Sequence, residues 1–447
     1  MTRMLVTVGL FFVLLAPLSR ADDLAASIEQ DYVQRLGALF EHFHRNPELS
    51  YLETKTAARL ATELRSHGVE VTEGVGGTGL VGMLRNGDGP LVLVRADMDG
   101  LPVKENSGLP YSSIATQMDG SGREVPVMHA CGHDVHITAL AGTAKQLSGR
   151  RETWSGTVMF IGQPAEERIG GAKAMLEDGL YERFGVPDFA LAFHVSAGEP
   201  AGKLAVRGGP IASSSDSVDI VVRGIGAHGA SPHKGKDPVY IASQIVVALQ
   251  SLISREVSPL RPGVVTVGSF HAGFKHNIIP DEARLQLTVR SNDDETRAQL
   301  LAGIERIARG VGIAAGLPED LLPLVTPTGE STPVTVNDIA LSERIRASLT
   351  DTLGEDAFYQ ETYDGMGAED FAYFVQTEHR VPGCYFTVGG TPQSDLDAAD
   401  NGGPALPSHH SPLFKIEPRA SVTAGVQAMT LAVLELLGEQ APSSASP

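Results

Sequence analysis

Three apolar runs of strand length alternate with helical patterns in the first half of this chain. The runs cover residues 91–96, 157–162 and 189–193, and residues 137–147 and 172–180 between them place apolar side chains at helical spacing. Strands that read as continuous apolar runs are buried on both faces, which requires helices on both sides of the sheet. We therefore expect an α/β fold with a mixed sheet flanked by helices.

Acidic and histidine side chains follow each of these runs. Asp97 and Asp99 follow the first run, Glu166 and Glu167 follow the second, and His194 follows the third. In α/β sheets, ligand sites gather where the carboxyl ends of the strands open. These side chains are therefore expected to lie near one another at one edge of the sheet.

The segment Met128-His-Ala-Cys-Gly-His-Asp-Val-His136 lies directly before a helical pattern. Cys131 and His133 in this segment are separated by one glycine, and a thiolate and an imidazole this close can both reach one divalent ion. A buried free cysteine beside histidines at a helix start is the alternative, since free cysteine is among the most buried residue types.

Glu166 and Glu167 suit the chemistry of hydrolysis. A divalent ion lowers the pKa of a water molecule that it binds, and a free carboxylate beside that water can take its proton and pass it to a leaving amine. Of two adjacent carboxylates, one can bind metal while the other faces the open side. Taken alone, Glu166 and Glu167 could be an exposed acidic pair, and His194 could be a histidine buried in the core. Their joint occurrence at predicted strand ends favours a metal site.

Residues 210–325 differ in character from the chain on either side. Their strand and helix patterns follow the order β-α-β-β-α and amount to about one small domain, and residues 208–215 read as a linker. The first pattern returns from residue 326. We expect a catalytic domain made of residues 22–209 and 326–438, with a smaller α+β lid or dimerisation domain inserted at 210–325.

The two ends of the chain read as segments outside the folded part. Residues 1–21 combine an early positive charge, an apolar run at residues 5–15 and small residues before Asp22, which is typical of a signal peptide. An uncleaved anchor is the alternative, and no other segment is expected to span a membrane. The protein is therefore expected in a periplasm or secreted. The Ser-, Pro- and Ala-rich residues 439–447 are expected to be disordered.

The charge of the chain argues against two classes of partner. The net charge of -19 and the pI near 5.1 argue against nucleic acid or an anionic membrane surface as a partner.

The two cysteines, Cys131 and Cys384, could form a disulfide after export, but not if Cys131 binds metal. Cys384 lies in an apolar, strand-like run, where a buried thiol is expected.

Seven motifs resemble those of the N-acyl-amino-acid amidohydrolases. They are Arg95-Ala-Asp-Met-Asp-Gly-Leu-Pro, Met128-His-Ala-Cys-Gly-His-Asp, Gln163-Pro-Ala-Glu-Glu, Gly226-Ala-His-Gly-Ala-Ser-Pro-His, His276-Asn-Ile-Ile-Pro-Asp, Gly367-Ala-Glu-Asp-Phe and His410-Ser-Pro. They follow the family's order from Gln34 to the final helix. The family belongs to the aminoacylase and glutamate-carboxypeptidase class of metallopeptidases. The most similar branch includes hippurate hydrolases and hydrolases of indoleacetyl-amino-acid conjugates.

This resemblance implies a zinc-peptidase-like catalytic domain that binds two divalent ions, with an inserted lid domain that commonly dimerises. The metal ligands that it implies are Cys131, His133, Glu167, His194 and His410. A thiolate favours Zn²⁺, whereas imidazole and carboxylate ligands also suit Mn²⁺, Co²⁺ or Ni²⁺. Asp97 and Asp99 are expected to orient these ligands.

The resemblance also implies roles for residues that do not bind metal. Glu166 resembles the general base and acid. His228, in the inserted domain, is similar to a histidine that stabilises the tetrahedral oxyanion, often from the partner subunit. Asn277 and Arg290 resemble substrate-binding groups, and Arg290 would suit a bidentate contact with a carboxylate.

We therefore expect an exported, metal-dependent amidohydrolase that converts a small N-acyl amino acid into a carboxylic acid and a free amino acid, as a homodimer or higher homo-oligomer. A dipeptidase or carboxypeptidase on the same scaffold is one alternative. A non-catalytic exported protein that binds metal or amino-acid conjugates is another. The polar insert at residues 391–407, just before His409, is expected to cap the pocket.

Overall fold

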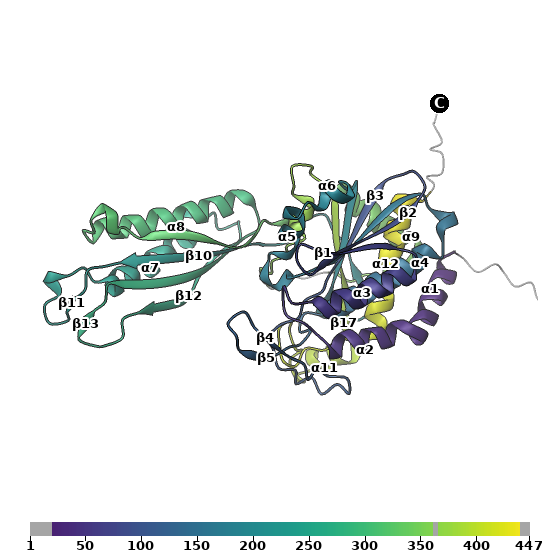
Figure 1. Cartoon of the computed structure of the whole chain (residues 1–447), viewed down its shortest axis with the longest axis horizontal. Coiled ribbons are helices and arrows are strands. Elements are labelled where there is room, and N and C mark those ends of the chain that lie inside the picture. The colour runs from purple at the N-terminus through teal and green to yellow at the C-terminus, as the bar shows by residue number, and fades with distance from the viewer. Residues whose placement is uncertain (1–19, 361–364, 439–447) are drawn as a thin grey trace, which may run out of the picture.

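The computed structural model describes residues 20–360 and 365–438, which form two domains side by side in an elongated molecule (Figure 1). The larger domain contains a seven-stranded sheet and the smaller one a four-stranded sheet. The tail predicted at 439–447 lies outside the described residues. So does the signal peptide predicted at 1–21, apart from the two residues with which α1 (Arg20–Asp31) begins.

The larger sheet is mixed, as expected. Its strand order is β1-β2-β6-β3-β7-β17-β8. The bounds are β1 (Glu70–Val75), β2 (Gly79–Asn86), β6 (Gly156–Gln163), β3 (Leu91–Asp97), β7 (Phe189–Pro200), β17 (Gly383–Thr391) and β8 (Leu204–Ala205). The four central strands β6, β3, β7 and β17 are parallel, so their carboxyl ends open at the same edge.

This sheet separates two hydrophobic cores, which explains why its strands are apolar on both faces. Along β2, Leu80 and Leu84 pack into one core, and Val81 and Met83 pack into the other. The first core lies under α1, α2 (Gly37–Arg45), α3 (Thr54–Ser66), α4 (His133–Ser148), α9 (Ile339–Leu353) and α12 (Pro418–Leu437), and the second under α5 (Gly171–Glu177), α6 (Leu180–Phe184) and α10 (Ala372–Val375). The α/β fold predicted from the alternating patterns is confirmed.

The helix α12 resembles a membrane-spanning helix in length and composition, although no span was expected in this part of the chain. Among the described residues it is the one helix whose length and composition would allow it to cross a bilayer. Its apolar side chains, including Val422, Val426 and Met429, are buried against the sheet and α4. The apolarity of α12 is therefore that of a core helix.

Strand pairing in the structure differs from the sequence-based expectation at three places. The strand β7 continues past His194 to Pro200, because β17 pairs with it over this length. The stretch predicted as a linker contains β9 (Gly209–Ala212) and the start of β10 (Ser214–Arg223), and β9 pairs with β16 (Thr335–Asn337). The expected domain boundary at residue 325 falls inside β15 (Leu324–Thr332), which pairs with β10.

The smaller domain is an antiparallel sheet covered by two helices on one face. Its strand order is β12-β14-β10-β15, with β12 (Gly263–Ala272), β14 (Glu282–Ser291), α7 (Pro238–Ser251) and α8 (Asp294–Ala314). Val218, Ile220 and Val222 of β10 point into the core under the helices. The short pair β11 (Ala227–His228) and β13 (Ile278–Ile279) lies at the end of this domain that is farthest from the larger one (Figure 1).

His44, on α2, connects two segments of the larger domain through buried carboxylates. Its Nδ1 lies 2.7 Å from Oδ2 of Asp134, and its Nε2 lies 3.2 Å from Oε1 of Glu105. Burial disfavours the charged imidazole, but these two hydrogen-bonded carboxylates outweigh burial and raise the pKa of His44 to about 9.

We expect this pKa difference to make stability fall at alkaline pH. The contribution is fully present below about pH 6.5, where the unfolded histidine is also protonated, and it is lost as the pH rises through about 9. It amounts to about 3 kcal/mol. Urea unfolding at pH 6.5 and 9.5 should show a larger loss for the wild type than for His44→Gln. Equal losses would contradict the assignment.

Candidate metal centre and active-site cavity

Cys131 and His133 are brought together by the turn that starts α4. His133 is the first residue of α4, and Gly132 before it has φ of 86°. A Cβ atom at Gly132 would lie 2.3 Å from Cγ1 of Val195. Only glycine therefore allows this turn to pack against β7, and the turn directs the thiol and the imidazole to the same edge of the sheet.

Glu166 and Glu167 lie on a single tight turn after β6, the acidic turn (Glu166–Arg168). The residue before the turn, Ala165, has φ of 48°, an uncommon conformation for a residue other than glycine. Two buried carboxylates hold the turn from below: Glu53 accepts the backbone N–H of Ala165 (2.7 Å), and Asp99 accepts those of Glu166 and Glu167 (3.1 Å each). The carboxylates of the turn are thus fixed by the backbone beneath them.

His194 presents a lone pair to the same region from within β7. Its Nδ1–H donates to the carbonyl oxygen of Val195 (2.7 Å), and its Nε2 lies 3.4 Å from Sγ of Cys131. Residue His410, from the loop before α12, approaches from the other side, with Nε2 3.4 Å from Oε2 of Glu167. The unusual φ of 64° at His410 directs this ring into the site.

The five expected metal ligands therefore converge. Cys131, Glu167 and His410 each offer a ligand atom within 4.8 Å of the others. His133 extends the cluster, because its Nε2 lies 4.0 Å from Oε1 of Glu167. A thiol, three imidazoles and a carboxylate form a donor set suited to Zn²⁺, Mn²⁺ or a similar ion.

Two further observations fit a cation at this place. Nε2 of His133 and Oε1 of Glu167 are buried, and neither has a hydrogen-bond partner among the described residues. Burial opposes the charged form of His133, but Asp97, Asp99 and Glu167 outweigh it and raise the pKa of His133 to about 10. The same negative charge would attract a metal ion, which replaces the proton on the ring.

Asp97 and Asp99 lie buried on either side of His133. Oδ1 of Asp99 is 3.3 Å from Nδ1 of His133, and Oδ2 of Asp97 is 3.7 Å from its Nε2. Asp99 also accepts the hydroxyl of Ser50 (2.6 Å). Asp99 thus lies against the imidazole and accepts the backbone N–H groups of the acidic turn, a geometry that would let it orient His133.

We expect Asp99→Asn to weaken metal binding by about 10- to 100-fold, because the amide cannot replace both functions of the carboxylate. Competition with a chelator would measure the affinity. Asp219→Asn, on the smaller domain, is the matched control and should leave the affinity unchanged. Equal affinities of the wild type and Asp99→Asn would exclude this orienting role.

Two histidines of the site were not singled out from the sequence. His136 donates from Nδ1 to Asp97 (2.5 Å) and accepts the backbone N–H of Val195 at Nε2 (2.9 Å). His409 accepts the N–H of Ala197 at Nε2 (2.9 Å), and its Nδ1 lies 3.7 Å from Sγ of Cys131. Because both ring nitrogens of each are engaged, these histidines support the site rather than offer free lone pairs.

Both cysteines are free thiols, and no disulfide joins them. Cys384 is fully buried in β17, and burial raises the pKa of its thiol to about 12. This agrees with the buried thiol expected there. Burial and the neighbouring Glu167 and Glu166 also raise the pKa of Cys131, so a bound cation would be needed to hold it as a thiolate.

Glu166 lies in a strongly acidic environment. Its Oε2 is 3.9 Å from Nε2 of His133, and it clusters with Glu369 and Asp370. Burial, followed by the charges of Glu369 and Glu167, raises the pKa of Glu166 well above its ordinary value. Such an environment favours uptake of a proton by this carboxylate.

A cavity of about 920 Å³ opens above these groups, between the two domains. Its lining includes Cys131, Glu166, Glu167, His194, His410, Arg290 and Asn292. The guanidinium of Arg290 donates to the hydroxyls of Ser215 (2.5 Å) and Thr288 (2.7 Å). Arg290 forms no ion pair with any described residue, so it is a partly buried cation that faces the cavity.

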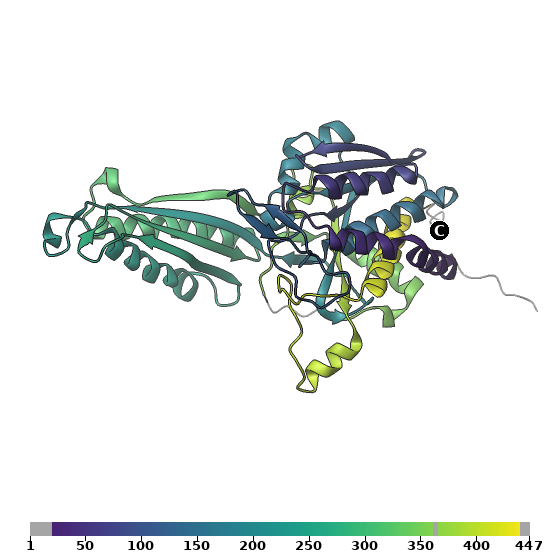
Figure 2. The ribbon, with the colours of Figure 1, turned by 60° about the horizontal axis from the view of Figure 1, so that its bottom comes forward.

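Three expected contributors do not reach this cavity within one chain. His228 and Asn277 belong to the distal end of the smaller domain, by the pair β11–β13. The insert at residues 391–407 contains α11 (Gln393–Asp400), which projects from the larger domain (Figure 2), and no residue from 391 to 407 lines the cavity. The expectation that this insert caps the pocket is therefore wrong.

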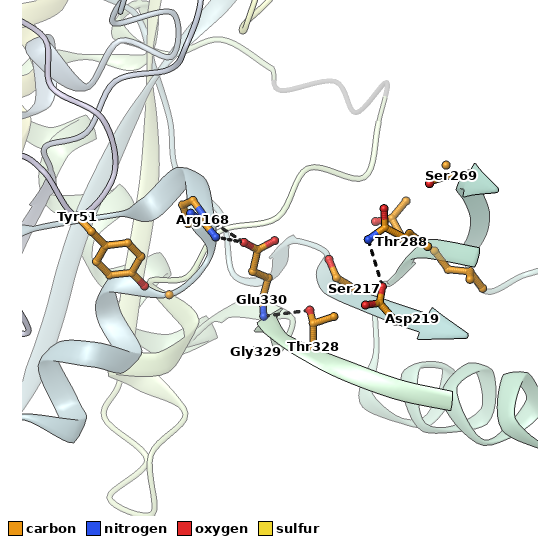
Figure 3. Close-up of a pocket in the computed structure, with 13 residues that line it drawn as sticks. Tyr51, Arg168, Ser217, Asp219, Ser269, Thr288, Thr328, Gly329 and Glu330 are labelled. Atoms are coloured by element: carbon orange, nitrogen blue, oxygen red, sulfur yellow. Dashed lines mark hydrogen bonds and ion pairs between the residues drawn. The ribbon is translucent and has the colours of Figure 1, made fainter. Parts of the chain in front are cut away.

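A second cavity of about 830 Å³ lies beside the acidic turn (Figure 3). Arg168, next to Glu167, donates to Oε1 of Glu330 on β15 (2.6 Å). Tyr51 from the larger domain and Asp219 from the smaller one line the same space. Figure 3 shows the Arg168–Glu330 pair between them, so the turn that carries Glu166 also contacts the smaller domain directly.

Residues 93–402 match the model of the peptidase family M20/M25/M40. The chain belongs to this family. It is 39% identical to thermostable carboxypeptidase 2 of Saccharolobus solfataricus over 351 residues, which cover 77% of this chain and 83% of that protein. It is also 39% identical to the hippurate hydrolase of Campylobacter jejuni, over 74% of this chain and 83% of that protein.

Other relatives in the M20 family agree with the branch seen in the motifs. IAA-amino acid hydrolase ILR1-like 2 of Arabidopsis thaliana is 36% identical over 83% of this chain and 79% of its own. The crystal structure of the YXEP protein of Bacillus subtilis, a dinuclear metal-binding peptidase from the M20 family, has a TM-score of 0.71 at 27% identity, covering 92% of this chain and 100% of that one. The resemblance to metal-dependent amidohydrolases is confirmed, and this M20 chain is an enzyme of that kind.

Proposed function

We propose that this M20 enzyme is an exported amidohydrolase that cleaves N-acyl amino acids into a carboxylic acid and a free amino acid. The observation that carries the proposal is the cavity itself. It places a proton-accepting carboxylate, Glu166, beside the converging thiol, imidazole and carboxylate groups, and an arginine without an ion pair, Arg290, on another wall. A substrate with a scissile amide and a free carboxylate matches these two features.

In this proposal, Arg290 binds the carboxylate of the amino acid. Its guanidinium is held by two hydroxyls rather than by an acidic side chain, so its charge remains available to an anion. Burial lowers the pKa of Arg290 from its ordinary value, and a bound carboxylate would offset that cost of burial. This preference for a free carboxylate is shared by N-acyl amino acids and by peptides cleaved at their C-terminus.

In this proposal, two divalent ions would be held by Cys131, His133, Glu167, His194 and His410. When bound, the ions supply electrophilic activation of the amide carbonyl and of a water molecule. Glu166 takes the proton of the attacking water and delivers it to the nitrogen of the leaving amino acid. Asp97 and Asp99 keep the imidazole of His133 oriented.

We further propose that His228 and Asn277 act on the site of a second copy in a homodimer. Within one chain they lie at the far end of the smaller domain. His228 is exposed, and the loop that contains Asn277 packs beside it, since the N–H of Gly229 donates to the carbonyl oxygen of Asn277 (2.9 Å). A partner's imidazole could then donate to the oxyanion that forms as water attacks.

A complementation experiment tests the dimer. Glu166→Gln and His228→Ala are each expected to be nearly inactive alone. Mixed dimers made by unfolding and refolding both variants together should recover activity, because one site then combines an intact Glu166 with a partner's intact His228. No recovery, despite mixed dimers seen by mass spectrometry, would exclude a role across the subunits.

The substrate assay decides the proposed function. The purified enzyme, loaded with Zn²⁺ or Mn²⁺, is tested on hippurate, N-acetyl amino acids and dipeptides by amine release. Faster cleavage of the acylated amino acids is expected, and activity should disappear with a chelator. Preference for dipeptides or longer peptides would instead favour a peptidase, as the carboxypeptidase among the relatives suggests. Export predicts a mature chain that begins at Asp22, which mass spectrometry of the secreted or periplasmic protein can measure.

A further inference from the structure

Ile169 has a backbone conformation that its side chain opposes. It closes the acidic turn with φ of 52° and ψ of 39°, in the left-handed region. For a β-branched residue this conformation is a clear outlier, because the Cβ substituents crowd the backbone. Glycine would adopt it without strain. The backbone geometry alone therefore gives no reason for isoleucine at this position.

The turn does not need the isoleucine side chain for its hydrogen bonds. The N–H of Ile169 donates to the carbonyl oxygen of Glu166 (2.7 Å), and the N–H of Gly171 donates to that of Ala165 (3.3 Å). Both bonds use backbone atoms only. The reason for isoleucine in this strained conformation must therefore lie in the contacts that its side chain makes outside the turn.

That side chain lines the active-site cavity. Ile169 is half-buried and belongs to the same cavity as the catalytic Glu166 and the cation Arg290. The apolar residues that share this cavity with it are Val195, Pro210, Ile211, Ala212 and Ala368. Pro210, Ile211 and Ala212 come from β9, directly before the smaller domain, and Ile211 also packs against the second core. Together with Ile169 they give the cavity an apolar wall that comes from two segments distant in sequence.

We propose that Ile169 and the β9 residues Pro210, Ile211 and Ala212 form the acyl pocket, and that Ile169 sets a preference for apolar acyl groups, aroyl or longer acyl, over acetyl. This inference rests on the proposed function. With the amino-acid carboxylate at Arg290 and the amide at Glu166, the acyl group and the amino-acid side chain are the parts of the substrate that remain. We assign the apolar wall to the acyl group, which is bonded to the amide carbonyl carbon and extends away from the carboxylate. Burying an aroyl or longer acyl group there removes much more apolar surface from water than burying an acetyl group does.

The test compares two substrates that share one amino acid, N-benzoylglycine and N-acetylglycine, so that the contact with Arg290 is the same in both. The selectivity is the ratio of their kcat/KM values. Ile169→Leu should keep the wild-type ratio, Ile169→Ala should lower it about tenfold, and Ile169→Gly should lower it further, since a small change in an apolar pocket has effects of this size.

Stability is expected to follow a different order, which separates the two roles of the residue. Ile169→Gly should be more stable than Ile169→Ala, because glycine relieves the left-handed backbone. Arg380→Gly is the matched control: Arg380 has φ of 51° and is exposed away from the cavity, so its replacement should relieve similar strain and leave the substrate ratio unchanged.

Two results would overturn the assignment, and they are distinguishable. Equal substrate ratios in the wild type, Ile169→Ala and Ile169→Gly would exclude Ile169 as a selector of the acyl group while leaving the proposed function standing. No cleavage of either acylglycine by the metal-loaded wild type would overturn both the acyl pocket and the proposed function.

Discussion

Replacing Glu166 with glutamine is expected to lower kcat about 10²- to 10⁴-fold while leaving the fold and the metal content unchanged. Glutamine has nearly the same shape as glutamate but cannot accept and return a proton. The backbone contact that positions the residue, from its N–H to Asp99 (3.1 Å), does not involve the side chain and is retained. The loss should therefore appear in turnover rather than in stability.

The Glu166→Gln measurement needs three readouts. Steady-state kinetics with an acylated amino acid give kcat and KM, elemental analysis gives the metal content, and thermal unfolding gives the stability. Glu177→Gln, at an exposed position of α5, is the matched control and should behave as the wild type. Activity of Glu166→Gln within a few-fold of the wild type would exclude Glu166 as the proton carrier.

Replacing Arg95 with methionine is expected to destabilise the protein by about 3–5 kcal/mol, because it leaves buried carboxylates without their cation. Arg95 is fully buried in β3. It donates to Asp97 (2.7 Å) and to Glu369 (2.7 Å), and Asp370 lies 3.4 Å away. Burial alone would lower the pKa of Arg95, but Asp97 and Glu369 raise it well above its ordinary value, so the arginine remains charged.

The Arg95 network also joins the two parts of the larger domain. Arg95 precedes the inserted domain in the chain, and Glu369 and Asp370 follow it. Gln163, at the end of β6, completes the contact by accepting from Arg95 (2.7 Å) and donating to Asp370 (2.6 Å). Loss of the cation should therefore also disturb Glu166, which lies against Glu369 and Asp370.

Urea unfolding measures the effect of Arg95→Met. The matched control is Arg85→Met on β2, where the arginine is exposed and pairs with an exposed Glu70 (2.6 Å). Such a surface pair contributes about 0–1 kcal/mol, so the control should lie close to the wild type. If both variants unfolded at the same urea concentration, the buried network would contribute little to stability.

Much of the larger domain could be predicted from local sequence patterns. The runs that became β3 and β6 are apolar on both faces because the sheet has a core on each side, and this is visible in the sequence without any partner strand. The residue types of the candidate metal centre were equally visible. Cys131 and His133 are neighbours in sequence, and Glu166 and Glu167 follow a strand.

Long-range pairing decided the features that the sequence did not show. The length of β7 depends on β17, which lies more than 190 residues later in the chain, as the pair Gly383–Ala190 shows. The roles of His136 and His409 as supports depend on backbone N–H groups of β7 that bond to their rings. No local pattern encodes these contacts.

The sequence by itself determined the fold class and the chemical types gathered at the strand ends, because hydrophobic periodicity and strand-end polarity are local properties of the chain. Only the tertiary structure decided which of these groups meet. It brought His410 to Glu167, placed the charges of Glu369 and Asp370 around Glu166, and left His228 at the far end of the smaller domain. The distances between remote segments, and the burial of their side chains, depend on how the whole chain packs. Local sequence patterns do not predict them.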